Sequence, residues 1–333
     1  MQTEEKNSKL SEFEIQQYSN CHLCPRNCGI NRLKGERGFC RMGPFPVVAR
    51  AALHYWEEPC ISGEKGSGAV FFSGCNLRCV FCQNQEISRG QAGKEITVDR
   101  LCEIFLELQE KGANNINLVT GVQFIPSIVS ALNMAKEKGL SIPAVYNCGG
   151  YESVGALKLL EGLIDIYLPD FKYFDKALAA QYSHAGDYPE RAKEALGEMF
   201  RQTGAPLFNS EGIMEKGVIV RHLLLPGKRK EAERILAYLY ETYGERIYFS
   251  IMNQYTPMKH CVAENPQKEQ NQAEQKEYKN LYRKVTTYEY DKTIEFALSM
   301  GIRKGYMQEG KTAEESFIPP FDMEGVEKTE TDH

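Results

Sequence analysis

Two patterns of hydrophobic and polar positions alternate along the chain from about residue 51 onward. Short apolar runs bounded by glycine or polar residues predict buried strands, and longer stretches with apolar residues three and four apart predict amphipathic helices. The predicted strands are 69–73, 115–120, 142–147, 164–170, 218–225 and 246–252, with a short last strand at 303–307. The predicted helices are 98–111, 126–139, 152–161, 189–202 and 229–243, and one more that ends near Met300. Unbroken apolar strands indicate a parallel α/β sheet covered by helices, in a barrel or an open doubly wound arrangement.

The rest of the chain divides by composition. Residues 1–18 are polar and charged and are expected to form a flexible leader, and residues 322–333 a flexible charged tail. Residues 19–50 are rich in Cys, Gly, Arg and Pro and predict a loop-dominated metal-binding module, which leaves 51–321 for the α/β part. The polar stretch 264–279 is expected to be a surface excursion.

Charge and composition exclude several classes of protein. The net charge is −5, from 40 basic and 45 acidic residues, so nothing indicates a nucleic-acid partner. No apolar run reaches the ~20 residues that a membrane helix needs, and the first residues lack the apolar segment of a secretory signal. Eight of the 11 cysteines lie in the first 82 residues, mostly at metal-like spacings. Thiolates on metal in a reducing cytoplasm explain them better than disulfides.

The strongest chemical signal is a cysteine motif directly after the first predicted strand. Cys75, Cys79 and Cys82 follow the spacing Cys-x3-Cys-x2-Cys. Three thiolates can hold three irons of a [4Fe-4S] cluster and leave the fourth iron free, whereas an electron-carrying cluster takes four. A zinc site completed by a distant ligand, or unconnected buried thiols, are the alternatives.

The surrounding residues favour the cluster. The run Gly-Cys-Asn-Leu-Arg-Cys-Val-Phe-Cys-Gln-Asn at 74–84 resembles the radical S-adenosylmethionine (SAM) superfamily. This resemblance implies a partial (β/α)6 barrel, with a cluster whose open iron binds SAM. Reductive cleavage of SAM then gives methionine and a 5′-deoxyadenosyl radical that takes a hydrogen atom from the substrate.

Residues near the motif are candidates for binding SAM. Gly74 lets the chain turn out of the first strand. Phe81 resembles the aromatic residue that flanks the adenine in this superfamily, and a hydrophobic plug under the cluster is its alternative role. Asn84 is expected to hydrogen-bond SAM or to cap the next turn. At the end of the second strand, Thr120 and Gly121 stand where the superfamily has Gly-Gly-Glu, so the glutamate that would hold the amino group of SAM is missing.

Later strand ends resemble the pyruvate formate-lyase activating enzymes. Tyr-Leu-Pro-Asp-Phe-Lys at 167–172 is similar to a family segment whose lysine approaches the SAM carboxylate and whose aspartate organises a cation site. The resemblance assigns these roles to Lys172 and Asp170, with a surface ion pair as the alternative. Val-Arg-His-Leu-Leu-Leu-Pro-Gly at 220–227 resembles another strand of that family. If Arg221 in this segment is buried, it needs an anionic partner. Gln254 or Tyr255 would replace a family histidine near the SAM ribose.

A second cysteine set precedes the barrel. Cys21, Cys24, Cys28 and Cys40 supply four thiolates, which suit tetrahedral zinc or a complete iron–sulfur cluster, and nearby arginines would offset their charge. The cysteines without ligand spacing are expected to be structural: Cys60, Cys102, Cys148 and Cys261.

The sequence therefore predicts a radical SAM oxidoreductase that resembles the activating enzymes of glycyl radical enzymes. That resemblance implies a glycine of a partner protein as substrate and a flavodoxin- or ferredoxin-type reductant. Radical modification of another peptide or of a small molecule is the second hypothesis. A non-catalytic iron–sulfur electron carrier is the third, because the second-strand motif is altered.

Overall fold

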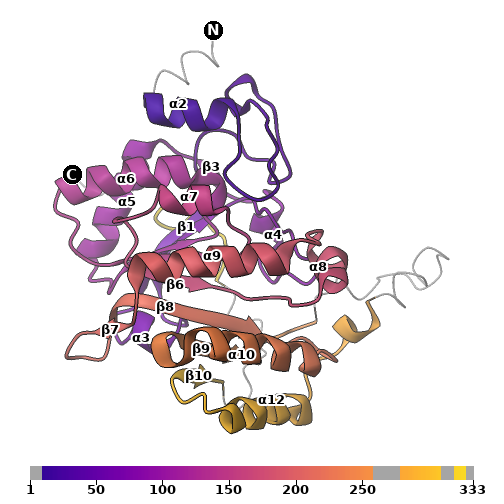
Figure 1. Cartoon of the computed structure of the whole chain (residues 1–333). Helices are drawn as coiled ribbons and strands as arrows, with labels where there is room; N and C mark the ends of the chain where they lie inside the picture. Colours follow the sequence, from indigo (N-terminus) through magenta and orange to yellow (C-terminus); the bar gives the residue numbers. More distant parts are fainter. Residues whose placement is uncertain (1–9, 258–277, 309–318, 328–333) are drawn as a thin grey trace.

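The strands form one twisted sheet that is curved into a partial barrel (Figure 1). The computed structural model describes residues 10–257, 278–308 and 319–327. The strand order is β10-β9-β8-β6-β5-β4-β2-β1-β3, with β7 paired to β8. Seven strands are parallel: β2 (Ser67–Phe72), β4 (Ile116–Val119), β5 (Ala144–Cys148), β6 (Ile166–Pro169), β8 (Met214–Leu223), β9 (Tyr248–Met252) and β10 (Gly305–Met307). Antiparallel pairs join β1 (Val47–His54) to β2 and to β3 (Lys94–Glu95), and β7 (Leu207–Phe208) to β8.

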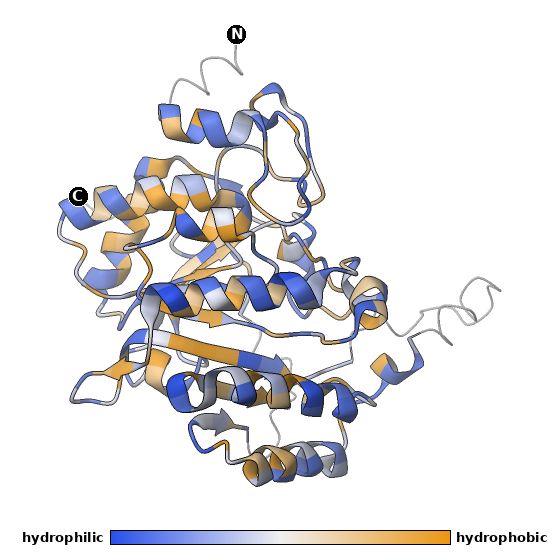
Figure 2. Cartoon of the chain, in the orientation of Figure 1, coloured by the Kyte–Doolittle hydropathy of each residue, from blue (hydrophilic) through white to orange (hydrophobic). Residues whose placement is uncertain are grey.

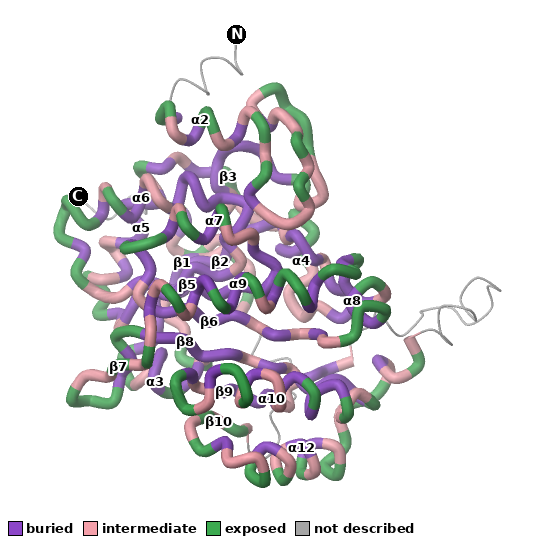
Figure 3. The backbone as a smooth tube through the Cα atoms, viewed as in Figure 1, coloured by how far each residue is buried: buried purple, intermediate pink, exposed green. Residues whose placement is uncertain are grey.

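Amphipathic helices cover the outside of the sheet. The longer helices are α5 (Val98–Glu110), α6 (Ile125–Glu137), α8 (Lys176–Ser183), α9 (Tyr188–Thr203), α10 (Arg229–Tyr243) and α12 (Thr287–Met300). The shorter elements are α3 (Pro59–Ser62), α4 (Gln85–Ser88), α7 (Val154–Lys158), η1 (Arg32–Lys34), η2 (Val122–Phe124), η3 (Gly244–Arg246) and η4 (Lys279–Tyr282). The strands are predominantly hydrophobic, and the helices carry apolar and polar stripes (Figure 2). The strands are also mostly buried, whereas the outer helices expose one side (Figure 3). Burial of these apolar faces drives the layered fold.

The predicted fold class is confirmed. Each of the seven predicted strands overlaps one of the parallel strands, and the predicted helices overlap α5, α6, α7, α9, α10 and α12. The sheet is a partial barrel rather than the alternative open doubly wound sheet, and the carboxyl ends of its parallel strands meet at one edge.

Alternation along the strands gives the barrel a polar inner face. Because successive side chains point to opposite faces of a strand, Asn147 and Arg221 lie on the inner side, while neighbours such as Tyr146 and Val220 belong to the main core beneath the helices. The inner face is apolar toward one end, where Val145, Ile166 and Ile219 form a separate cluster.

The amino-terminal region is more ordered than the sequence suggests. The sequence predicts a flexible leader up to residue 18, but residues Glu12–Ser19 form α2, which begins with a capping box between Ser11 and Glu14. Tyr18 is fully buried, and its hydroxyl lies 2.9 Å from that of Ser127 on α6. Strand β1 begins at Val47, so the sheet also starts before the expected boundary at residue 51.

The described part of the carboxyl-terminal tail packs on β1. The sequence predicts that the barrel extends to residue 321 and that a flexible tail begins at residue 322. The backbone N–H groups of Ala51 and Met323 donate to the carbonyl oxygens of Glu324 and Ala49, respectively, and Val326 is buried. These bonds satisfy backbone groups at the edge of β1. The predicted surface excursion at 264–279 falls almost entirely outside the described residues.

Candidate functional site: a cysteine loop at the mouth of the barrel

The loop that carries Cys75, Cys79 and Cys82 leaves the carboxyl end of β2 through a sharp turn at Gly74. Gly74 has φ +83°, and its N–H donates to the carbonyl of Ile87. A β-carbon there would lie 2.4 Å from Cγ of Met42, so neither the backbone conformation nor the available space suits another residue. The turn thus places the cysteines over the mouth of the barrel.

The three thiols of the loop act on one another. Burial, followed by the negative charges of Cys79 and Cys82, raises the pKa of Cys75 to about 12. Burial and Cys79 likewise raise the pKa of Cys82 to about 11. Thiols in this state are protonated at neutral pH, and metal binding must displace their protons. The hydroxyl of Ser183 donates to Sγ of Cys79 at 2.9 Å, and the N–H of Leu77 donates to Sγ of Cys75 at 3.3 Å.

The chemistry of these donors suits an iron–sulfur cluster. A [4Fe-4S] cluster places each thiolate on a different iron. The donor set of three neighbouring thiols on one loop, of which Cys79 is buried and the other two are partly buried, therefore fits such a cluster with one iron left open.

Lys172, Asp170 and Arg221 come together at the ends of β6 and β8. Nζ of Lys172 lies 2.5 Å from Oδ2 of Asp170, and Nε of Arg221 donates to Oδ1 of Asp170 at 2.9 Å. Burial alone would raise the pKa of Asp170, but the two cations lower it below its ordinary value. Their side chains are 15 to 19 % exposed, so the alternative of an ion pair on the open surface does not hold.

Lys172 also faces the cysteine loop. Burial lowers its pKa, but Asp170 and Cys79 outweigh this and raise the pKa of Lys172 overall. Its ammonium is thus a positive charge beside the position expected for the cluster. His222, by contrast, points out of the barrel, where its Nδ1 bonds to the carbonyl of Phe171 at 2.8 Å and burial lowers its pKa to about 4.

Sequence reasoning missed two buried glutamates. Glu57, from the loop between β1 and α3, accepts bonds inside the barrel from Asn117 (3.2 Å), Asn147 (3.1 Å) and Arg221 (3.2 Å). Burial raises the pKa of Glu152, which follows β5, to about 8, and its Oε2 has no hydrogen-bond partner. In the sequence, Glu57 is marked only by its place in a pair of adjacent glutamates, Glu57 and Glu58, before a proline.

Thr120 and Gly121 follow β4 as expected, and Thr120 is strained. Its φ is +59°, a left-handed conformation that is a real outlier for a β-branched residue. The N–H of Thr120 donates to the carbonyl of Asn147, and its own carbonyl accepts from Nε2 of Gln123. Strain of this kind costs about 1–3 kcal/mol and concentrates at functional sites.

The other three candidates, Phe81, Asn84 and Gln254, differ in their surroundings. Phe81 is buried and makes edge-to-face contacts with Tyr173, Tyr182 and Tyr255. Asn84 precedes α4 and makes no side-chain cap there, so that alternative does not hold. The carbonyl of Gln254 accepts from Gln83 of the cysteine loop at 2.8 Å, and its side chain bonds to Gln308.

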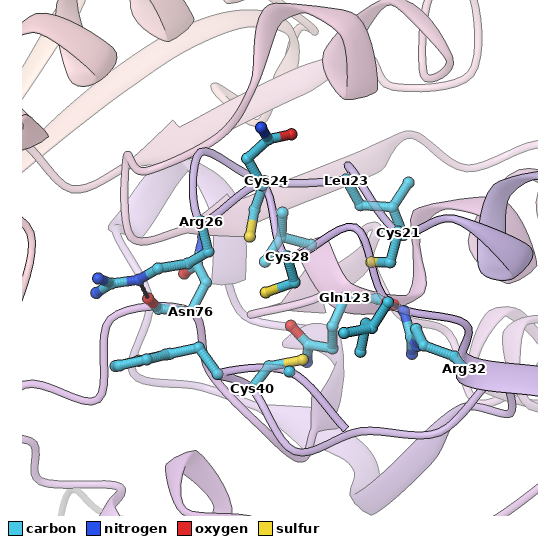
Figure 4. Close-up of a pocket in the computed structure, with 14 residues that line it drawn as sticks. Cys21, Leu23, Cys24, Arg26, Cys28, Arg32, Cys40, Asn76 and Gln123 are labelled. Carbon is cyan, nitrogen blue, oxygen red and sulfur yellow. Dashed lines mark hydrogen bonds between the residues drawn. The ribbon is translucent and has the colours of Figure 1, made fainter. Parts of the chain in front are cut away.

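The second cysteine set surrounds a pocket. The sulfur atoms of Cys21, Cys24, Cys28 and Cys40 point into one space (Figure 4). This pocket has about 390 Å³ free of protein atoms, partly open to solvent. Of the other four cysteines, Cys60, Cys102 and Cys148 are buried free thiols, and Cys261 lies outside the described residues.

Comparison with known proteins identifies the family. The family model "Radical SAM superfamily" matches residues 69–239, just over half of the chain. The chain belongs to the radical SAM superfamily. Membership implies an enzyme that uses a [4Fe-4S] cluster and SAM, as the cysteine motif predicts.

Similar proteins support the more specific resemblance in part. The chain is 29% identical over 289 residues to the uncharacterized protein MJ0674 of Methanocaldococcus jannaschii, an alignment that covers 84% of this chain and 75% of that protein. It is 29% identical over 114 residues to a pyruvate formate-lyase-activating enzyme of Clostridium pasteurianum, covering 32% of this chain and 45% of the relative. The predicted resemblance to those enzymes is confirmed as a distant one. Among the described helices, none has the length and apolarity to cross a bilayer.

Proposed function

We propose that this radical SAM protein abstracts a hydrogen atom from a glycine residue of a partner protein, as an activating enzyme of a glycyl radical enzyme. The observation that carries the proposal is the three-thiol loop at the mouth of a partial barrel in a chain of this superfamily. The similarity to a pyruvate formate-lyase-activating enzyme supports the choice of substrate.

In this proposal Cys75, Cys79 and Cys82 hold the cluster. When bound and reduced, the cluster supplies the electron that splits SAM into methionine and the 5′-deoxyadenosyl radical. The ammonium of Lys172, oriented by Asp170, binds the carboxylate of SAM, because a charge-assisted hydrogen bond is strong in a partly buried site. Arg221 keeps Asp170 ionised beside that lysine.

Six residues on and around the loop complete the proposed SAM site. Gly74 shapes the loop, and the backbone carbonyls of Thr120 and Gly121 replace the missing glutamate as partners of the amino group. Asn84 and Gln254 contribute polar groups near the nucleotide. Phe81 acts from beneath the cluster, where its tyrosine neighbours exclude water.

We also propose the setting in which the protein works. Its reductant is a flavodoxin- or ferredoxin-type protein in the cytoplasm. The ten described cysteines are all free thiols, which supports a reducing compartment. Cys21, Cys24, Cys28 and Cys40 bind a second metal centre, either zinc or iron–sulfur.

The substrate is tested with the reconstituted protein, SAM, a reductant and a candidate glycyl radical enzyme. Electron paramagnetic resonance should detect a glycyl radical on the partner with the wild-type protein and none with Cys79→Ala. Cys102→Ala, which changes a buried thiol away from the loop, is the matched control and should retain activity. 5′-Deoxyadenosine formation without a glycyl radical on any candidate partner would contradict the proposed substrate.

Two other functions are separated by the same assays. Modification of a different peptide or of a small molecule would give 5′-deoxyadenosine and an altered product by mass spectrometry. A non-catalytic electron carrier would bind no SAM. The altered motif at Thr120 and Gly121 is the observation that keeps this last alternative open.

A further inference from the structure

The four-cysteine pocket is built from tight turns that expose sulfur atoms to one space. The N–H of Cys21 donates to the carbonyl of Ile30, and that of Gly29 donates back to Cys21, which clamps the base of the loop. A further turn bond joins the N–H of Asn27 to the carbonyl of Cys24. The loop between Cys21 and Cys28 is thus fixed by its own backbone, with its thiols directed inward (Figure 4).

The opposite wall leaves room for a group larger than an ion. Gly38 lies against the pocket, and a β-carbon on it would stand 2.7 Å from Sγ of Cys28. The space free of protein atoms between the four cysteines is about 390 Å³ and is partly open to solvent. Zinc would need all four sulfurs at about 2.3 Å from a single centre.

Positive charge in the lining also suits a metal centre held by thiolates. Arg32 is fully buried, lines the pocket, and leaves its Nε without a hydrogen-bond partner, while its other nitrogens bond to the carbonyls of Gln123 and Gly43. Arg26 also lines the pocket. Two guanidinium groups offset the negative charge that four thiolates bring with a cluster.

We propose that Cys21, Cys24, Cys28 and Cys40 bind a second [4Fe-4S] cluster, with one thiolate on each iron. The inference rests on the proposed second metal centre and decides its identity. Because every iron has a protein ligand, this cluster exchanges an electron without binding SAM. It lies beside the cysteine loop, since Arg26 donates to the carbonyl of Asn76 at 2.8 Å, and Gln123 joins the pocket to the carbonyls of Ser73 and Gly74.

The test separates the two cysteine sets by metal content rather than activity. After anaerobic reconstitution, iron, sulfide and zinc are measured per chain in the wild-type protein and in two variants. The wild type should hold about eight irons, four from each cluster. The variant Cys75→Ala/Cys79→Ala/Cys82→Ala should keep about four irons with matching sulfide. Cys24→Ser/Cys28→Ser should also keep about four, those of the other site.

Other contents of the triple variant overturn the inference. One zinc without iron would support the proposed second metal centre but refute the [4Fe-4S] cluster. Two irons would have the same consequence. No metal in a triple variant that folds by circular dichroism would refute both. If the triple variant does not fold, a wild-type content of about four irons refutes the cluster.

Gly38→Ala gives an independent check that keeps all four thiols of the pocket. Its β-carbon collides with the sulfur of Cys28, so we expect iron in the Gly38→Ala form of the triple variant to fall at least severalfold. Gly155→Ala, which meets no atom within 4 Å, is the matched control and should leave iron unchanged. Equal iron in both would contradict the proposed position of the cluster.

Discussion

Arg221 donates from Nε to Oδ1 of Asp170 across 2.9 Å and thereby joins the ends of two neighbouring parallel strands. Both side chains are mostly buried, and each has a second partner of opposite charge: Glu57 for Arg221 and Lys172 for Asp170. The four charges balance. A buried pair contributes little net stability, but the loss of one member leaves the others uncompensated.

Asp170→Asn is therefore expected to destabilise the protein by about 3–5 kcal/mol, because Lys172 loses its anion and Arg221 one of two. The free energy of unfolding in urea, followed by circular dichroism, measures the loss. Asp322→Asn is the matched control, since Asp322 is half exposed in its pair with Arg50 and should cost no more than about 1 kcal/mol. Equal losses in the two variants would contradict the role of the buried network.

The same pair predicts acid sensitivity. Because the folded-state pKa of Asp170 is lowered, its stabilisation is complete above the unfolded value of about 3.9 and disappears as the pH falls through the folded value. The stability difference between wild type and Asp170→Asn should therefore be constant from pH 5 to 7 and shrink below about pH 4. A difference that stays unchanged down to pH 2 would show that charge is not its origin.

The wild-type protein should lose stability as the pH rises toward 8, and Glu152→Gln should remove this loss. Burial raises the pKa of Glu152 from 4.5 to about 8, so the folded state holds a proton that the unfolded state releases. Between these values wild-type stability should fall by about 1.4 kcal/mol per pH unit relative to the variant. Urea unfolding at pH 5, 6.5 and 8 measures the slope, and exposed Glu137→Gln should run parallel to wild type. A parallel curve for Glu152→Gln would contradict the protonated carboxyl.

The sheet could be predicted because most residues of its parallel strands are apolar, and the strand ends then located Asp170, Lys172 and Arg221. Strand β1 was not predicted because its buried positions do not alternate regularly, and its register shifts between Val48 and Arg50. Helix α2 is polar along most of its length and is anchored by Tyr18, whose partner Ser127 is 109 residues away. Contacts at such separations leave no local pattern in the sequence.

Ser183→Ala should make the cluster at the cysteine loop harder to reduce. The Ser183 hydroxyl donates to Sγ of Cys79 at 2.9 Å, and hydrogen bonds to cluster sulfurs raise the reduction potential. We expect a more negative midpoint in a redox titration followed by electron paramagnetic resonance, and SAM cleavage slower by about tenfold. Exposed Ser141→Ala is the control. An unchanged midpoint in Ser183→Ala would show that this bond does not tune the cluster.

Arg26→Met should loosen the contact between the four-cysteine pocket and the cysteine loop. The guanidinium of Arg26 donates to the carbonyls of Asn76 (2.8 Å), Ser183 (2.9 Å) and His184, and it stacks 3.9 Å above the ring of Phe39. A hydrogen bond from a charged donor contributes about 1.5–3 kcal/mol, so the variant should lose at least that much stability.

Hydrogen exchange locates this loss. In Arg26→Met, amides of residues 76–82 and 183–185 should exchange faster, while those of β5 and β6 keep the wild-type rate. Arg191→Met, which removes an exposed arginine paired only within its own helix and its cap, should change neither segment. If exchange in 76–82 stays slow in Arg26→Met, the loop is held by the barrel alone, and the two cysteine sets are mechanically independent.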